Sequence, residues 1–129
     1  MATVSSKPQK ITLPDLLANC PFTLSVNPHY ARCRAESSAW IESFNFFLDP
    51  HKRLAFYQAD SERLCAYAYP YANYEGLRIC CDFVNLLFTI DEISDTQTGE
   101  GAKATGDVFL DVFNGKEVVD SELSRMSYQ

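Results

Sequence analysis

The sequence lacks the features that mark membrane, secreted and nucleic-acid-binding proteins. Its longest apolar run, residues 79–90, is interrupted by Asp82 and Asn85, whereas a membrane-spanning helix needs about 20 apolar residues. The start MATVSSKPQK has positive charges but is not followed by the apolar h-region of a signal peptide, so no secretory signal is expected. With 11 basic against 17 acidic residues, the chain has no excess positive charge to offer a nucleic-acid backbone. We therefore expect neither a membrane span nor a nucleic-acid partner.

Glycine and cysteine are also too few, or wrongly spaced, for several kinds of site. The five glycines form neither a P-loop nor a G-x-G-x-x-G turn, so no glycine-rich phosphate loop is present. The five cysteines are an odd number without C-x-x-C spacing, which favours reduced, buried thiols over a disulfide framework. Reduced thiols in turn predict a cytoplasmic location.

The chain does contain enough apolar and aromatic side chains for one core. Hydrophobic residues make up 47% and charged residues 22% of 129 residues, which is typical of a single globular domain. The net charge of −6 is unevenly distributed, because residues 1–90 carry as many bases as acids. The whole acidic excess begins at Asp91 and therefore needs an explanation.

The first 26 residues carry no helical signal. Residues 1–10 are polar, and we expect them to be disordered. Residues 11–26 are apolar but are interrupted by Pro14 and Pro21, which the interior of a helix does not tolerate. We expect this segment to be an extended arm that packs on the core.

Apolar residues recur at helical spacing through most of the remaining chain. Asn27-Pro28, Asp49-Pro50 and Asn73 are typical of helix starts, because Asn and Asp cap the first turn and proline fits its first position. No stretch alternates as a strand does. The sequence therefore predicts an all-α fold, with helices over residues 28–48, from 50 to Pro70 in one or two pieces, 74–95 and 104–114.

The helix predicted over residues 74–95 has two contrasting faces. At about 100° per residue, one face is apolar and ends in acid. Its members are Leu77, Cys80, Val84, Leu87, Phe88, Asp91 and Asp95. The opposite face consists of Glu75, Arg78, Asp82, Asn85 and Thr89. Because Arg78 and Asp82 form an i,i+4 pair, we interpret the polar face as a surface that is hydrated or faces a groove.

Two carboxylates on the apolar face occupy positions that a purely structural role would disfavour. Asp91 and Asp95 are four residues apart, where like charges on a helix repel by about 0.2–0.5 kcal/mol. They also lie in the last turn, where the helix dipole disfavours each anion by about 0.3–1 kcal/mol. A divalent cation would reverse the sign of these effects. The alternative interpretation is an acidic helix end exposed to solvent.

The ligand types in this segment indicate which cation would bind. Oxygen donors without His or Cys favour Mg²⁺, with Mn²⁺ as the other possibility, over Zn²⁺. Mg²⁺ commonly binds through one or two carboxylates together with waters and substrate phosphates. The pocket below the acids would be lined by Phe88, Leu87 and Val84. This combination favours a diphosphate with an apolar tail as the ligand.

Five segments of the chain resemble one protein family. They are LPDLLAN at 13–19, NPHY at 27–30, AESSAW at 35–40, AYAYPYA at 66–72 and CDFVNLLFTIDEISD at 81–95. The last is the most specific, because it places an aspartate-rich motif at the end of an apolar helix. From about Leu13 to Phe113 the chain is similar to the N-terminal part of class I terpene synthases, specifically the sesquiterpene cyclases of mushroom-forming fungi.

This resemblance implies the all-α helical bundle of terpenoid synthases. It also implies Mg²⁺ as cofactor and an isoprenyl diphosphate as substrate, with farnesyl diphosphate expected. Asp91 and Asp95 match the metal ligands of the family motif, and Glu92 is a neighbouring acid. The implied reaction is the metal-dependent ionisation and cyclisation of farnesyl diphosphate, a lyase reaction for which no obligate protein partner is evident.

The chain departs from the family pattern towards its C-terminal end. The second metal motif, N-D-x-x-S-x-x-x-E, has no match, and neither do the diphosphate-sensing Arg and the Arg-Tyr pair. We expect residues 11–114 to form a partial terpene synthase domain and residues 115–129 to be a divergent tail. We expect these 129 residues alone to be catalytically inactive. The alternatives are a non-catalytic helical fragment and a divalent-ion-binding interaction module.

Overall fold

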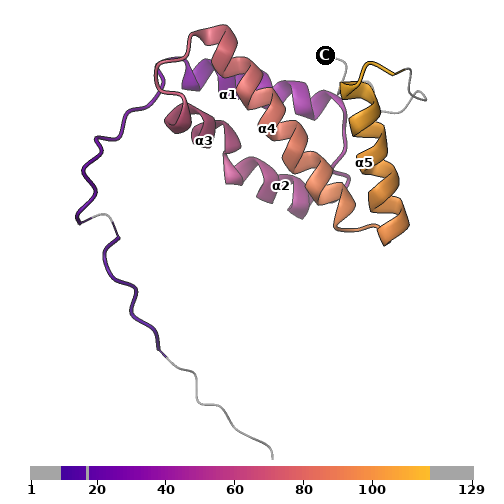
Figure 1. The fold of residues 1–129 in the computed structure, drawn as a ribbon, viewed down its shortest axis with the longest axis horizontal. Helices are drawn as coiled ribbons and strands as arrows, with labels where there is room; N and C mark the ends of the chain where they lie inside the picture. The colour runs from indigo at the N-terminus through magenta and orange to yellow at the C-terminus, as the bar shows by residue number, and fades with distance from the viewer. Residues whose placement is uncertain (1–9, 17, 117–129) are drawn as a thin grey trace, which may run out of the picture.

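The computed structural model describes residues 10–16 and 18–116. Within these ranges the chain forms α-helices and no strand (Figure 1), which confirms the all-α prediction. The helices are α1 (Tyr30–Ser43), α2 (Pro50–Ala59), α3 (Ser61–Ala68), α4 (Tyr74–Ser94) and α5 (Gly99–Phe113). The predicted disorder of residues 1–9 and most of the predicted tail lie outside the described residues.

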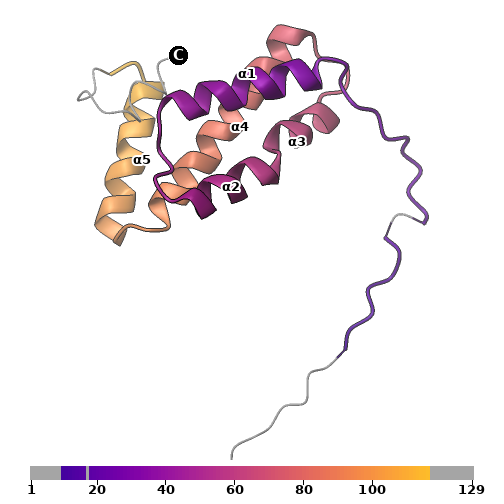
Figure 2. The ribbon, with the colours of Figure 1, turned by 180° about the vertical axis from the view of Figure 1, so that it is seen from behind.

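α4 is the central helix of the bundle. It contacts α1, α3 and α5, and α1 also contacts α3. Figure 1 and the reverse view in Figure 2 show α5 standing across one end of the other four helices. Among the described residues, no helix combines the length and the apolar character that a membrane span requires.

Two of the predicted helix starts are confirmed. The Asp49 carboxylate accepts a hydrogen bond from the backbone N–H of His51 at 2.8 Å, and Pro50 is the first residue of α2. Oδ1 of Asn73 accepts from the backbone N–H of Gly76 at 2.9 Å and so opens α4. Both caps are contacts within three residues, which is why the sequence predicts them.

The start of α1 differs from the prediction because Asn27 has a larger role than a cap. Its Oδ1 accepts from the backbone N–H of His29 at 2.9 Å, and the helix begins only at Tyr30. Its Nδ2 donates to the carbonyl oxygens of Tyr69 and Ala72, both at 2.8 Å. Asn27 is therefore a buried link between the end of the arm and the α3–α4 connection.

The end of α1 and the start of α5 also differ from the prediction. α1 ends at Ser43 rather than at residue 48, and Asn45 adopts a left-handed backbone with φ of 51°, which an α-helix cannot continue through. α5 begins at Gly99 rather than at residue 104, because Oγ1 of Thr98 accepts from the N–H of Gly101 at 3.3 Å. At both positions local backbone chemistry outweighs the apolar spacing.

A break at Asp60 separates α2 from α3, so the second predicted helical stretch is in two pieces. Asp60 has φ of 53°, a left-handed conformation that Asp tolerates better than most residues. Its carboxylate accepts from the Tyr30 hydroxyl at 2.6 Å and pairs with Arg34 at 3.2 Å and Arg63 at 2.9 Å. Side chains of α1 and α3 therefore hold the break in place.

Two apolar clusters form the core. The first joins α1, α3 and α4 through the buried residues Cys33, Cys65, Leu77 and Cys81. The second surrounds Ile41 and Leu86 with partly buried side chains, most of them aromatic: Trp40, Phe44, Phe46, Phe47, Phe56, Tyr57, Ile90 and Phe109. All five cysteines carry free thiols. Thiols and aromatic rings thus supply much of the packing.

The prediction about the two faces of α4 is wrong in the C-terminal half of the helix, although Leu77 is buried and Glu75 exposed as predicted. Asn85 and Thr89, which belong to the face predicted to be hydrated, are 1% and 0% exposed. Leu87 and Phe88, on the predicted apolar face, are 41% and 43% exposed. The reason is that α1 and α3 supply polar partners for Asn85, so polarity does not mark the solvent side of this helix.

The N-terminal arm is extended, as predicted, but the prediction that it packs on the core is wrong. Residues 10–16 and 18–26 are exposed throughout, and Figure 1 shows the arm running away from the helices. Its exposed apolar side chains are Ile11, Leu13, Leu16, Phe22, Leu24 and Val26. The end of the arm lies beside Tyr67, Pro70 and Tyr71, with which Phe22 and Leu24 line an open hollow, but this contact buries none of the apolar side chains of the arm.

Candidate metal centre

The last turn of α4 carries the three acids predicted as metal ligands. Asp91 and Glu92 belong to α4, and Asp95 follows its last residue with a backbone that is still helical (φ −61°, ψ −24°). The N–H of Asp95 donates to the carbonyl oxygen of Asp91 at 3.0 Å. The side chains of Asp91 and Asp95 therefore leave the helix on the same side, one turn apart.

These three acids differ from Asp107 and Asp111, which also belong to the acidic excess. Asp107 pairs with Lys103 at 2.5 Å on α5, and Asp111 pairs with Lys116 at 2.7 Å. In the described part of the chain, Asp91, Glu92 and Asp95 form no ion pair, and all three are exposed. The repulsion between them is therefore not offset by an ion pair.

A cavity of about 340 Å³ lies between α2, the start of α3 and the end of α4. Its lining residues are Lys52, Ala55, Phe56, Ala59, Ser61, Phe88, Asp91 and Glu92. Alanine methyl groups and two aromatic rings form its apolar part, and two carboxylates, one ammonium and one hydroxyl form its polar part. The cavity thus combines a charged side with an apolar side, as binding sites for amphipathic ligands do.

The structure brings some of the predicted site residues together and separates others. Asp91, Glu92 and Phe88 line the same cavity. Asp95 and Leu87 are exposed outside its lining. Val84 packs against the cluster of buried thiols on the α1–α3 side of the helix. The pocket therefore draws most of its apolar wall from α2, and α4 contributes only Phe88 to it.

Two lining residues, Lys52 and Ser61, were not identified from the sequence. Lys52 lines the cavity and also a neighbouring hollow of about 140 Å³ that it shares with Glu92. Among the described residues Lys52 forms no ion pair. Its place one turn after the capped start of α2 is readable from the sequence, but the packing of α2 opposite the end of α4 is not.

The donor set of the cavity fits a hard divalent cation. Carboxylate and hydroxyl oxygens line it, and neither His nor Cys does, which suits Mg²⁺ or Mn²⁺. No group of three or more His, Cys, Asp and Glu side chains in residues 10–16 and 18–116 is arranged to hold a metal ion by itself. Mg²⁺ needs only one or two carboxylates where waters and ligand phosphates complete its coordination. The residues present therefore fit a cation that is shared with a ligand.

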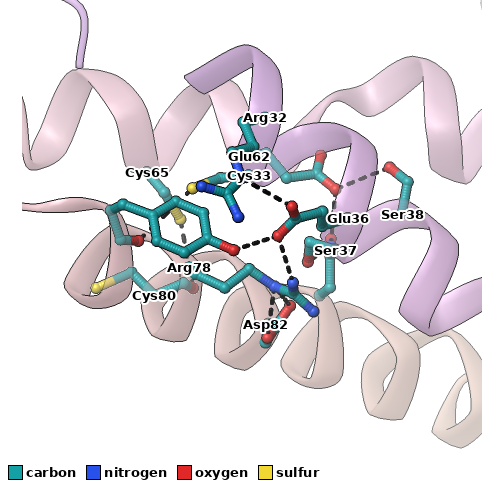
Figure 3. A network of polar contacts seen from close by, with 12 residues as sticks. Arg32, Cys33, Glu36, Ser37, Ser38, Glu62, Cys65, Arg78, Cys80 and Asp82 are labelled. Atoms are coloured by element: carbon teal, nitrogen blue, oxygen red, sulfur yellow. Dashed lines mark hydrogen bonds and ion pairs between the residues drawn. The ribbon is translucent and has the colours of Figure 1, made fainter. Parts of the chain in front are cut away.

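A buried polar cluster lies directly behind the cavity wall. Nδ2 of Asn85 donates to Oγ of Ser37 at 2.9 Å and to Oε1 of Glu62 at 2.8 Å. Oγ of Ser61 donates to Oδ1 of Asn85 at 2.5 Å, and Oγ of Ser38 donates to Oε1 of Glu62 at 3.0 Å. Figure 3 shows the Glu62 carboxylate joined by a dashed line to Ser38. The cluster ties α1, α3 and α4 together and reaches the cavity through Ser61.

A second polar network links α1 to the N-terminal half of α4, away from the cavity (Figure 3). Arg78 donates to Asp82 at 2.8 Å and to Glu36 at 3.1 Å, and Arg32 donates to Glu36 at 2.9 Å. The hydroxyl of Tyr74 also donates to Glu36. Hydrogen bonds from Tyr74 and Arg32 hold the pKa of the Glu36 carboxyl below its usual value. None of these residues lines the cavity, so the network stabilises the bundle.

Comparison with curated proteins identifies relatives of this chain, although no protein-family model matches it. A bifunctional terpene synthase of Cyclocybe aegerita is 48% identical over 125 residues, 96% of this chain and 36% of that protein. A delta(6)-protoilludene synthase of Stereum hirsutum is 43% identical over 106 residues, 82% of this chain and 28% of that protein. A Coprinopsis cinerea protein named as a linoleate 10R-lipoxygenase is 53% identical over 102 residues, 79% of this chain and 29% of that protein.

The helical fold, the acidic turn and these similarities define the chain as a relative of fungal terpene synthases. More narrowly, most of its length matches part of the sesquiterpene synthases of basidiomycete fungi, which confirms the resemblance found in the sequence. The chain spans about a third of the length of the curated relatives it matches.

Proposed function

We propose that this chain supplies the metal- and diphosphate-binding part of a sesquiterpene synthase that ionises and cyclises farnesyl diphosphate. One observation carries the proposal: Asp91 and Glu92 line the same cavity as Phe88 and the apolar side chains of α2. Oxygen ligands for a cation are thus adjacent to a space suited to a hydrocarbon chain. The names of several relatives as sesquiterpene synthases support the reaction class.

Each side chain at the cavity has a defined part in this proposal. Asp91 and Glu92, with Asp95 one turn later, hold the cation, and Lys52 contacts the diphosphate oxygens from α2. When bound, Mg²⁺ supplies positive charge that stabilises the leaving diphosphate. The apolar side chains of α2 exclude water from the hydrocarbon. The ring face of Phe88 attracts the positive charge that develops on the hydrocarbon.

The five free thiols are consistent with a reducing compartment, and we propose the cytoplasm as the location. We also propose that the 129-residue chain alone does not turn over farnesyl diphosphate, because its sequence has no counterpart of the second metal motif. Incubation with Mg²⁺ and extraction of volatile products tests this. Any sesquiterpene above the no-protein blank would contradict it.

Binding of farnesyl diphosphate to the chain tests the site itself. Calorimetric titration with and without Mg²⁺ should show binding that depends on the metal ion and is lost in Asp91→Asn. Asp82→Asn is the matched control, since Asp82 lies on the same helix, pairs with Arg78 at 2.8 Å and does not line the cavity. We expect this control to bind as the wild type does.

The outcomes separate the proposal from its alternatives. Equal binding by the wild type and Asp91→Asn would remove the metal-site interpretation and leave a non-catalytic helical fragment. Mg²⁺ binding that is the same with and without the diphosphate would favour a divalent-ion-binding interaction module instead.

A further inference from the structure

Ser61 differs from the other oxygen-bearing side chains of the cavity because it is buried. It is 6% exposed, whereas Asp91 and Glu92 are exposed at the cavity mouth. Its hydroxyl is also the end of the buried polar cluster, through its hydrogen bond to Asn85. The orientation of the Asn85 amide therefore determines whether the Ser61 hydroxyl can donate a hydrogen bond into the cavity.

The direction of every hydrogen bond in this cluster is determined. Oε1 of Glu62 accepts from Asn85 and from Ser38, so the NH₂ group of the Asn85 amide must face Glu62. The second hydrogen of that NH₂ group goes to Ser37. Oδ1 of Asn85 therefore faces Ser61 and can only accept, and the single proton of the Ser61 hydroxyl is used there.

The consequence is a hydroxyl that acts only as an acceptor towards the cavity. No described residue donates to Oγ of Ser61, so this oxygen keeps its capacity to accept, and Ser61 is one of the residues that line the cavity. A hydrated divalent cation brings strongly polarised O–H donors into such a space, since Mg²⁺ keeps several of its waters when protein carboxylates bind it. A hydroxyl with a free proton could donate it to Asp91 or Glu92 and so compete with the cation for these carboxylates. The Ser61 hydroxyl cannot do so, because its proton is used by Asn85.

We propose that Ser61 accepts a hydrogen bond from the water shell of the cation held by Asp91 and Glu92, and that Asn85 and Glu62 are positioning residues for it. The inference rests on the metal site of the proposed function. It adds a buried residue of α3 to a metal site that otherwise consists of exposed acids on α4. It also adds two residues, Asn85 and Glu62, that fix the direction in which the Ser61 hydroxyl donates.

Binding of Mn²⁺ to the 129-residue chain in the presence of inorganic diphosphate, with a no-protein blank for the Mn²⁺ that diphosphate binds by itself, tests this without requiring turnover. The paramagnetic resonance signal of free aqueous Mn²⁺ falls as the ion binds, which gives the affinity directly. Loss of a residue that supports a metal site from outside its ligand set typically costs about 10–100-fold in affinity. We expect Ser61→Ala to weaken Mn²⁺ binding by about tenfold or more, and Ser61→Thr, which keeps the hydroxyl, to bind as the wild type does.

Two further variants distinguish positioning from general loosening of the bundle. Ser38→Ala is the matched control, because Ser38 donates to the same Glu62 oxygen but does not line the cavity; we expect unchanged affinity. Glu62→Gln gives Asn85 a partner that can itself donate, so the amide is free to turn and the polarity of Ser61 is no longer fixed. We expect its affinity to fall between those of the wild type and Ser61→Ala.

The outcomes separate this inference from the proposed function. If Asp91→Asn abolishes Mn²⁺ binding while Ser61→Ala binds as tightly as the wild type, the metal site stands and the role of Ser61 is refuted. Equal losses in Ser61→Ala and Ser38→Ala would also refute it, because the effect would then come from the cluster as a whole. If the wild type and Asp91→Asn bind Mn²⁺ equally, the proposed function fails, and this inference fails with it.

Discussion

At the scale of single residues, Asn85 shows how one amide can determine the packing of three helices. Its hydrogen bonds reach Ser37 of α1 and both Ser61 and Glu62 of α3, and all four side chains are buried. A buried polar group without a partner costs about 1–3 kcal/mol. The full set of bonds forms only when α1, α3 and α4 pack in one register, so Asn85 disfavours every other arrangement of these helices.

Replacing Asn85 should therefore be costly. We expect Asn85→Ala to lower the free energy of unfolding by on the order of 3 kcal/mol, because it leaves Ser61 and Glu62 without their shared partner in the core. Urea unfolding followed by circular dichroism measures this. Asn114→Ala is the control, since Asn114 donates only to the carbonyl of Leu110 at the surface, and we expect a change below about 0.5 kcal/mol. Similar losses in both variants would contradict this account of Asn85.

The Glu36 carboxyl gives the bundle a dependence on pH. Hydrogen bonds from Tyr74 and Arg32 lower its pKa in the folded state. A carboxyl with a lowered pKa stabilises the fold above its unfolded pKa, about 4.3 for Glu, and this contribution is lost as the pH falls through the folded value. We expect Glu36→Gln to melt below the wild type at pH 7, and the difference to shrink as the pH falls below about 4.3. A difference that does not change between pH 7 and acid would contradict this.

Sequence reasoning at this scale succeeded where a relation is local. The one-turn spacing of Asp91 and Asp95 follows from a helix alone, and the structure has it. The burial of Asn85 was missed because the polar partners that allow it come from α1 and α3. Ser61 and Lys52 were missed because a residue lines a cavity only through the packing of distant segments.

At the scale of elements, the break between α2 and α3 depends on a balance of backbone and side-chain terms. Asp60 adopts a left-handed backbone, which costs about 1–2 kcal/mol for a typical residue and nothing for glycine. Against this, its carboxylate binds Tyr30, Arg34 and Arg63. The carboxylate is 12% exposed, so these contacts are more effective than ion pairs in open solvent.

Two substitutions at Asp60 separate these terms. Asp60→Gly removes the backbone strain together with the carboxylate, and we expect a lower melting temperature because the contacts outweigh the strain. Asp60→Asn tolerates the same backbone conformation and keeps one acceptor oxygen for Tyr30, so we expect an intermediate melting temperature. A variant with glycine that melts above the wild type would show that the backbone term is the larger one.

The helix starts that could be predicted from the sequence are those with a capping side chain close to them in the sequence. Asp49 and Asn73 bond to N–H groups within three residues and mark helix starts in the sequence. The end of α1 was missed because the apolar aromatic residues after Ser43 belong to the core without being helical. The start of α5 was missed because its first turn contains two glycines, which apolar spacing does not detect.

At the scale of the whole molecule, apolar side chains remain exposed in several places. One is the arm, where Phe22 is 84% and Leu24 73% exposed. Another lies on α4 and α5, where Phe83, Leu110 and Phe113 are 42%, 57% and 57% exposed. Contiguous apolar surface larger than a few hundred Å² is unusual on a monomer and promotes association.

We expect the 129-residue chain to bind a hydrophobic dye and to elute earlier from a sizing column than a 14.6 kDa monomer. Replacing Phe22 and Leu24 together by Ser should reduce both effects if the arm contributes. Lys103→Gln, a change at an exposed charged position of α5, is the control and should leave both unchanged. A sharp cooperative melt with monomeric elution and no dye binding would contradict this.

The exposed arm also carries a thiol that reagents in solution can reach. Cys20 lies on it and is exposed, whereas Cys33, Cys65 and Cys81 are buried. Burial raises the pKa of Cys33 and of the half-buried Cys80, which slows their reaction with alkylating reagents at neutral pH. A fluorescent maleimide should therefore label the arm first. The sequence has a single tryptophan, Trp40 in α1. Energy transfer from its indole to the label on Cys20 would therefore measure the distance between the arm and α1.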